Sequence, residues 1–446
     1  MKVTGIIAEC NPLHNGHDYL IQSARRETGA DYLILAISGD YVQRGEPAVI
    51  DKYARTRALL ARGADLVLEL PLCYACGGAD YFARGAVALL DSLGVVTDLC
   101  FGSESGDTAL LQRAADTLRR ADRSDAVQAA IRAYLKQGLS YPAAREQAIR
   151  EHGAAFSPVT LSSPNDLLAA EYCRALADRD SAIRPHAIHR ISTDSASGIR
   201  SALQGSASGG EALMLKKRTG TGEVSGPDTA TDNDADSERQ GGIWTEHFSS
   251  LALPLCMKEE LTAAWNLTAP VFADDFSAAL LYRLQMSASF GSLSDCLDVS
   301  PDLAARIENL LPQFQTWTQF CALLKTKNLT YTRISRALLH ILLNLRKSHM
   351  AEYKAAGLVG YARLLGFRKE AAPLLTTIKA NASVPLLSKL SAASDLLPPV
   401  FQRMLGEDIR AAELYDAIAR GKFFAKRSQK ALPPFRRECQ REIERR

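Results

Sequence analysis

Residues 3–29 read VTGIIAECNPLHNGHDYLIQSARRETG and contain the first structural unit of the chain. The apolar run at 3–9 predicts a buried strand, and the apolar spacing of residues 17–29 predicts an amphipathic helix. A short polar turn that holds His14, Gly16 and His17 separates the two. A strand that passes through a turn into a helix is the repeating unit of α/β proteins.

The same alternation continues along the chain. Further strands are predicted at the apolar runs 32–38, 64–71, 95–102 and 181–191. Residues 53–63 have the pattern of a helix that connects two of them. We therefore predict an α/β fold with a parallel sheet over residues 1–203, and a helix-rich insertion at about 107–153.

The composition changes at Gln204. Residues 204–240 are rich in Gly, Ser, Thr, Asp and Asn and bury too little apolar surface to offset the entropy of ordering, which predicts a flexible polar linker. From 241 to 446 most apolar residues recur at helical spacing, and we predict a second, α-helical domain. Its expected helical segments include 274–286, 303–314, 331–345, 361–367 and 383–397.

The overall composition excludes several classes of protein. A chain of 446 residues is too long for a single small binding module, and its net charge of +3 is too low for a general polyanion binder. No apolar run is long enough for a membrane span and no export signal is apparent, which predicts a cytoplasmic protein. The nine cysteines are irregularly spaced and are expected to be reduced. Cys73 and Cys76 lack a second pair, so we predict no metal site there.

Basic residues clearly outnumber acidic residues near the end of the chain. Residues 422–446 hold nine basic and three acidic residues. They fit either a solvated basic tail or a surface for RNA phosphates, with stacking on Phe423, Phe424 or Phe435. The candidate RNA-binding residues are Lys422, Lys426, Arg427, Lys430, Arg436 and Arg437.

His14 and His17 are the candidate catalytic residues. They lie where the first strand gives way to a helix, and the unpaired N–H groups of a helix start attract phosphate. Two imidazoles there can stabilise the negative charge that builds up during transfer at phosphorus. The alternative is that both histidines simply cap the helix.

A second candidate phosphate site lies at the far end of the same domain. Ser195, Ser197 and Arg200 precede or open a predicted helix, and hydroxyls with an arginine at a helix start suit a phosphate group. An ordinary serine cap followed by a surface arginine is the alternative.

Several segments together resemble a known family. His-x-Gly-His is typical of the nucleotidyltransferase superfamily, whose members have a Rossmann-like fold and catalyse attack at the α-phosphate of a nucleotide. The segments 5–17, 38–47, 63–71, 101–104 and 162–172 resemble the bacterial tRNA(Met) cytidine acetate ligases. This resemblance covers most of the chain except 204–240.

The resemblance implies a specific reaction. Members of that family activate acetate with ATP and pass the acetyl group to N4 of the wobble cytidine of elongator tRNA(Met), and the ATP is expected to bind as a Mg²⁺ complex. It implies an ATP site formed by Ile7, Ala8, Glu9, Cys10, Asn11, Pro12, Leu13, His14, Asn15, Gly16, His17, Asp18, Tyr19, Leu20, Gly102, Asn165 and Arg190.

The residues alone leave other functions open. A small-molecule adenylyltransferase or cytidylyltransferase would use the same histidines, although such enzymes are usually shorter. A nucleotide- and RNA-binding protein without turnover is the third possibility. Asn165 fits a helix cap as well as a ligand contact. The sequence predicts neither a metal ligand nor an oligomeric state.

Overall fold

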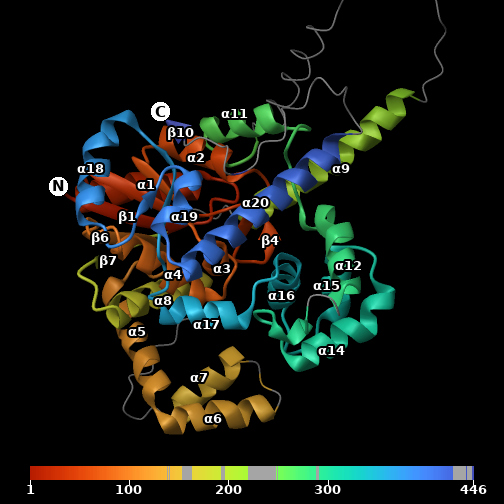
Figure 1. Ribbon diagram of the computed structural model, residues 1–446, viewed down its shortest axis with the longest axis horizontal. Coiled ribbons are helices and arrows are strands. Elements are labelled where there is room, and N and C mark those ends of the chain that lie inside the picture. Colours follow the sequence, from red (N-terminus) through yellow and green to blue (C-terminus); the bar gives the residue numbers. More distant parts are fainter. Residues whose placement is uncertain are drawn as a thin grey trace, which may run out of the picture.

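The computed structural model in Figure 1 shows a central sheet with helices on both faces and a separate group of helices to one side. It describes residues 1–137, 139, 141–152, 163–191, 196–218, 248, 250–287, 291–424, 438 and 444–445. Across these residues, no helix has both the length and the apolar character needed to cross a membrane.

An eight-stranded sheet forms the centre of the fold, with the strand order β10-β8-β5-β2-β1-β6-β7 and β9 paired to β8. The five N-terminal strands are mutually parallel, as the sequence predicted. They are β1 (Val3–Ala8), β2 (Tyr32–Ser38), β5 (Leu66–Leu70), β6 (Asp98–Ser103) and β7 (Arg184–His189). β1 lies in the middle, between β2 and β6.

Alternate side chains of β1 enter two different cores. Val3 and Ile7 pack with the helices α4 (Ala79–Asp91) and α8 (Pro164–Asp178). Ile6 points to the other face, where α1 (Asn15–Thr28) and α2 (Lys52–Ala61) lie. A strand buried on both faces reads as a continuous apolar run, which is why these strands were predictable.

Three helices occupy the region where an insertion was predicted. They are α5 (Thr108–Arg123), α6 (Asp125–Lys136) and α7 (Tyr141–His152). α6 and α7 protrude at the edge of the molecule (Figure 1). They share a small apolar cluster around Val127 and Ile131, separate from the cores on the sheet.

The predicted linker is wrong over its first part. α9 runs from Ala196 to Arg218, so residues 204–218 are helical. Within 204–218 three glycines, at 205, 209 and 210, interrupt the run of alanine, leucine, serine and lysine, and a helix that starts upstream continues through them. Most of the remaining part, from 219 to 240, lies outside the described residues.

The next helices form a group with their own apolar core, centred on Trp317, Phe320 and Phe276. The helices of this region are α11 (Leu255–Ala264), α12 (Ser277–Gln285), α14 (Pro301–Leu310), α15 (Trp317–Leu324), α16 (Tyr331–Leu343) and α17 (Lys347–Ala355). α11 packs instead on α2 of the sheet region. The helical prediction for 274–286, 303–314 and 331–345 is confirmed.

The last part of the chain returns to the sheet, so the region predicted as a second, α-helical domain also contributes strands. Residues 361–367, predicted as helical, contain β8 (Ala362–Phe367), which pairs antiparallel with β5. Periodicity cannot distinguish so short an apolar run from a helical turn. Residues 383–397 contain β9 (Leu386–Leu387) and the short helix α19 (Ala393–Leu396) in place of one long helix.

The C-terminal elements connect the two regions. α18 (Ala372–Asn381) follows β8 in the chain. β10 (Glu444–Arg445) pairs in parallel with β8. The long helix α20 (Pro399–Phe424) contributes Met404 to the core on the sheet and Tyr415 to the core of the helical group. Figure 1 shows α20 crossing the molecule between these two parts.

A loop after β2 is held from both sides. It carries the hairpin β3 (Tyr41–Val42) and β4 (Glu46–Pro47), and its turn at Gly45 has a φ of +76°. A Cβ atom at Gly45 would lie 2.3 Å from the backbone nitrogen of Arg336 on α16, so only glycine fits. Ser335 Oγ donates to the Gly45 carbonyl oxygen at 2.8 Å.

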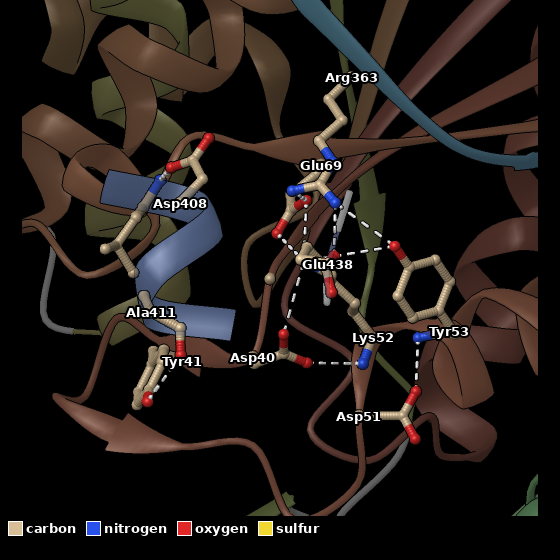
Figure 2. A network of polar contacts seen from close by, with 12 residues as sticks. Asp40, Tyr41, Asp51, Lys52, Tyr53, Glu69, Arg363, Asp408, Ala411 and Glu438 are labelled. Atoms are coloured by element: carbon tan, nitrogen blue, oxygen red, sulfur yellow. Dashed lines mark hydrogen bonds and ion pairs between the residues drawn. The ribbon is translucent and has the colours of Figure 1, made fainter. Parts of the chain in front are cut away.

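Beneath this loop lies a buried ionic network (Figure 2). Lys52 is fully buried, and its Nζ lies 2.7 Å from Glu438, 2.9 Å from Glu69 and 3.5 Å from Asp40. Arg363 of β8 pairs with Glu69 and Glu438. Glu438 therefore joins the C-terminal segment to the interior of the sheet.

Candidate active site

The candidate site is a cavity of about 610 Å³ at the carboxyl ends of β1, β6 and β7. The chain leaves β1 toward β2 on one side, whereas β6 pairs with β1 on the other side. Open parallel sheets bind ligands in the crevice at such a switch point. The cavity therefore lies where the fold favours a ligand.

His14 and His17 form the start of α1 and line this cavity. Nδ1 of His14 accepts a hydrogen bond from the Gly16 backbone N–H at 3.1 Å, and Nδ1 of His17 accepts one from the His14 backbone N–H at 3.4 Å. The two side chains thus form a reciprocal capping box, with ring centroids 3.9 Å apart. The two interpretations of the sequence coincide here, since the histidines both cap the helix and face the cavity.

The caps also determine which nitrogen carries a proton. A neutral imidazole that accepts at Nδ1 has its hydrogen on Nε2. Burial lowers the pKa of His17 well below its ordinary value, and the nearby His14 and Arg190 act in the same direction. His17 is therefore neutral near pH 7 and offers an Nε2–H donor.

Most of the residues predicted for ATP lie around the cavity. Its lining includes Ile7, Ala8, Glu9, Asn11, His14, Gly16, His17, Tyr19, Leu20, Gly102, Asn165 and Arg190.

The other residues of the predicted segment have structural contacts. Cys10 and Leu13 are fully buried in the core below α1. Asp18 pairs with Arg62, and the backbone N–H of Asn15 donates to the carbonyl of Ala252. These residues and Pro12 are not in the cavity lining, so their part in the prediction is not supported by the geometry.

Asn165 is not the cap of α8. Ser163 Oγ accepts from the Asp166 N–H and fills that role, whereas Asn165 Nδ2 donates to Glu104 Oε1 at 2.5 Å. Glu104 Oε2 accepts from Ser163 Oγ at 2.8 Å. Glu104 directly follows β6, and no role was predicted for it although it lies in the segment 101–104 that resembles the family.

The predicted phosphate loop lies partly within the described residues. Ser197, in the first turn of α9, lines the cavity, whereas Ser195 lies outside the described residues. Arg200 donates from Nη2 to Ser197 Oγ at 3.2 Å and from Nη1 to the Asn11 carbonyl at 3.1 Å. Arg44 donates to the same Ser197 Oγ at 3.0 Å. An arginine of α9 and an arginine of the loop after β2 therefore meet at one hydroxyl beside the cavity.

Glu9 connects β1 to the loop after β2. Its Oε1 accepts a hydrogen bond from the Gln43 backbone N–H at 2.7 Å, and both residues line the cavity. Arg55 is fully buried and donates to the Glu9 carbonyl oxygen at 2.8 Å. The sequence left the place of Gln43 and Arg44 open, because only the folded loop brings them to the cavity that the histidines line.

The predicted RNA-binding cations are largely outside the described part of the chain. This holds for Lys426, Arg427, Lys430, Arg436 and Arg437 and for the ring of Phe435.

Lys422 lies within the described residues, and its contacts do not favour the predicted RNA contact. Its Nζ contacts the Pro270 carbonyl and the Asp275 carboxylate, both at 2.8 Å, so its charge is already paired within the protein. Phe423 is buried and cannot stack on a base, whereas Phe424 is exposed.

No metal centre is built from protein side chains in the described ranges. There, no group of three or more His, Cys, Asp or Glu residues could hold a metal ion. Cys73 and Cys76 are buried, and burial raises the pKa of both thiols well above the ordinary value. Both are therefore inert thiols that belong to the interior.

Comparison with known proteins identifies the class. The model of the family described as HIGH Nucleotidyl Transferase matches residues 1–431, and the chain belongs to this family. A protein of Acetivibrio thermocellus named tRNA(Met) cytidine acetate ligase is 33% identical over 435 residues, covering 96% of this chain and 98% of that protein. The protein of the same name from Clostridium kluyveri is 35% identical, covering 89% and 92%.

Two solved structures are similar over the whole chain. The crystal structure of Thermotoga maritima TmcAL bound with alpha-thio ATP is 30% identical with a TM-score of 0.82, and all of both chains is covered. The apo form of the same protein is 29% identical with a TM-score of 0.80, covering 100% of this chain and 99% of that one. The predicted fold class, a Rossmann-like sheet domain with a helical region, is confirmed.

Proposed function

We propose that this protein is an ATP-dependent ligase that forms acetyl-adenylate from acetate and ATP and transfers the acetyl group to N4 of the wobble cytidine of elongator tRNA(Met). The observation that carries the proposal is the His14–His17 capping box at the cavity, in a chain similar over nearly its full length to proteins of that name. The neighbour bound with an ATP analogue supports ATP as the nucleotide.

The first step needs little acid–base chemistry. Acetate is already an anion at neutral pH, so the site has to position it and offset charge. An acetate oxygen attacks the α-phosphorus, and the Nε2–H groups of His14 and His17 donate to the phosphoryl oxygens as charge accumulates. Arg200 and Arg44, which meet at Ser197, are placed to hold the departing pyrophosphate.

Mg²⁺ fits this site only as a companion of the triphosphate. The described residues hold no dedicated cluster of metal ligands, and Mg²⁺ is commonly bound by phosphate oxygens, water and one or two carboxylates. Among the described residues of the cavity lining, Glu104 is the carboxylate that would take part in holding the ion. When bound, the ion would supply charge neutralisation of the phosphates.

We also place the reaction in the cytoplasm, where tRNA is modified. The helical group and the basic C-terminal segment are the proposed RNA-binding parts, with Lys426, Arg427, Lys430, Arg436 and Arg437 as the candidate contacts. Affinity for tRNA is then expected to fall steeply with salt concentration.

The test is incubation of the protein with ATP, radiolabelled acetate and total tRNA, followed by digestion to nucleosides. Label in N4-acetylcytidine, dependent on ATP and on tRNA(Met), is the expected result. ATP consumption that is independent of acetate and yields a nucleotide-linked metabolite would favour a small-molecule nucleotidyltransferase. Nucleotide and tRNA binding without any turnover would favour a binding protein.

A further inference from the structure

The second half of the proposed reaction raises a proton-transfer problem. Acylation of the exocyclic amine of cytidine forms an N–C bond and leaves a proton on N4 that must be accepted by another group. Neutral imidazoles with Nδ1 already accepting hydrogen bonds cannot take it without losing the caps of α1. The other possible acceptors among the described residues of the lining are the solvent-exposed His189 and the carboxylates, and the carboxylates are the less exposed of these groups.

Only two carboxylates occur among the described residues that line the cavity, Glu9 and Glu104. Both oxygens of Glu104 already accept hydrogen bonds, from Ser163 and from Asn165, and Arg190 lies 3.9 Å away. These contacts suit a structural anchor for the start of α8. They occupy both oxygens of the carboxylate, so neither is left to take a proton from a ligand.

Glu9 has a different environment. Its Oε1 is fixed by the Gln43 N–H, and among the described residues none hydrogen-bonds to its Oε2. Glu9 lies at the end of β1, five residues before His14, on the central strand of the sheet. One oxygen therefore orients the group, and the other remains for a ligand.

We propose that Glu9 is the general base of acetyl transfer to the cytidine amine. This inference rests on the proposed function. The N4 lone pair attacks the acetyl carbonyl carbon of acetyl-adenylate, and the bond between this carbon and the phosphate oxygen breaks. AMP leaves with the bonding electrons. The N4 proton passes to Oε2 of Glu9, which returns it to solvent after the products leave.

The charges around Glu9 are compatible with this role. Burial raises the pKa of Glu9 above its ordinary value, which strengthens the carboxylate as a base. The Gln43 N–H and the cations Arg200, Arg44 and Arg55 lower the pKa and oppose this effect. The neutral His17 adds no positive charge near pH 7.

The test separates the two half-reactions in Glu9→Gln. Glutamine retains an oxygen for the Gln43 N–H, so the loop keeps its anchor. Without tRNA, acetate-dependent exchange of labelled pyrophosphate into ATP is expected to stay within about twofold of wild type, since this step needs no base. Hydroxylamine, a strong nucleophile, is expected to trap the acetyl group equally well in both proteins. Formation of N4-acetylcytidine is expected to fall about 10²- to 10⁴-fold.

A pH series adds a second readout. In single-turnover transfer from the preformed acetyl-adenylate, the wild-type rate is expected to rise with pH until Glu9 is fully ionised and then to level off. The residual rate of Glu9→Gln is expected to lack this rise. Glu308→Gln, the same substitution at an exposed position on α14, is the matched control and is expected to behave as wild type.

Two results would overturn the role of Glu9. Equal losses in exchange and transfer would assign Glu9 to activation of acetate, and full transfer by Glu9→Gln would remove it from the reaction. Absence of acetate-dependent exchange in the wild-type protein would instead overturn the proposed function itself.

Discussion

The capping box of α1 allows the chemistry of His14 to be separated from its structural role. His14 supplies a cap through Nδ1, which accepts the Gly16 N–H at 3.1 Å, and we assign its Nε2–H to the transition state. Asparagine is among the best N-cap residues, but it has no donor at the position of Nε2. His14→Asn is therefore expected to keep the cap and lose the donor, whereas His14→Ala loses both.

The two roles have different expected magnitudes. Loss of a helix cap costs about 0.5–2 kcal/mol of stability. Loss of one preorganised donor to a transition-state oxyanion costs about 10²- to 10³-fold in rate. Both variants are thus expected to lose this factor in acetate-dependent pyrophosphate release, while only His14→Ala also loses about 1 kcal/mol in the free energy of unfolding.

The assays are initial rates of pyrophosphate release at saturating ATP and acetate, and urea unfolding of the same preparations. Asn15→Ala is a useful control, because Asn15 is not in the cavity lining and its contact to Ala252 uses only the backbone. A His14→Asn rate within threefold of wild type would refute the proposed donor. Equal destabilisation by asparagine and alanine would refute the cap.

Three further predictions follow from the buried and charged groups. Lys52→Met leaves Asp40, Glu69 and Glu438 with one cation fewer, and it is expected to lower the free energy of unfolding in urea by about 3–5 kcal/mol. The control Lys327→Met, at an exposed position, is expected to change this free energy little. A loss below about 1 kcal/mol in Lys52→Met would contradict the network. Burial raises the pKa of Asp408 to about 7 in the folded protein, so the native state holds this proton more tightly than the unfolded chain, and stability from this group is lost as pH rises from about 4 to about 7. Asp408→Asn is accordingly expected to flatten the fall in stability over that range, and an unchanged pH dependence would show that the group titrates normally. Arg200→Lys keeps the positive charge, but a lysine cannot contact Ser197 and Asn11 at the same time. This substitution is expected to lower kcat/KM for ATP about 10- to 100-fold in the pyrophosphate-release assay. An unchanged kcat/KM would exclude a contact between Arg200 and the phosphates.

The sheet was largely readable from the sequence because its strands are buried on both faces. The predicted runs 32–38 and 64–71 contain β2 and β5, and the turn with the two histidines lies where the pattern placed it. Such strands need continuous apolar residues, and this local signal survives without knowledge of tertiary contacts.

The features that the sequence did not predict depend mainly on contacts between segments that are distant in the chain. β8 is a strand because the open side of β5 pairs with it, and nothing within residues 361–367 reveals that partner. Glu9 and Gln43 become neighbours only when the hairpin folds back over β1, so the sequence could place Glu9 near a ligand but not show what holds it. The continuation of α9 through residues 204–218 was not predicted because this segment is polar. A helix that has already started needs little further apolar contact to extend.

The pairing of β8 with β5 has a consequence for synthesis on the ribosome. The N-terminal strands emerge early, but the segment that covers β5 is made only after the whole helical group. Until then β5 is an unpaired edge strand of the nascent sheet, and exposed edge strands promote aggregation with other chains. Polypeptides cut short before β8 are therefore expected to aggregate, and the nucleotide-binding half cannot be produced alone simply by stopping translation at its apparent end.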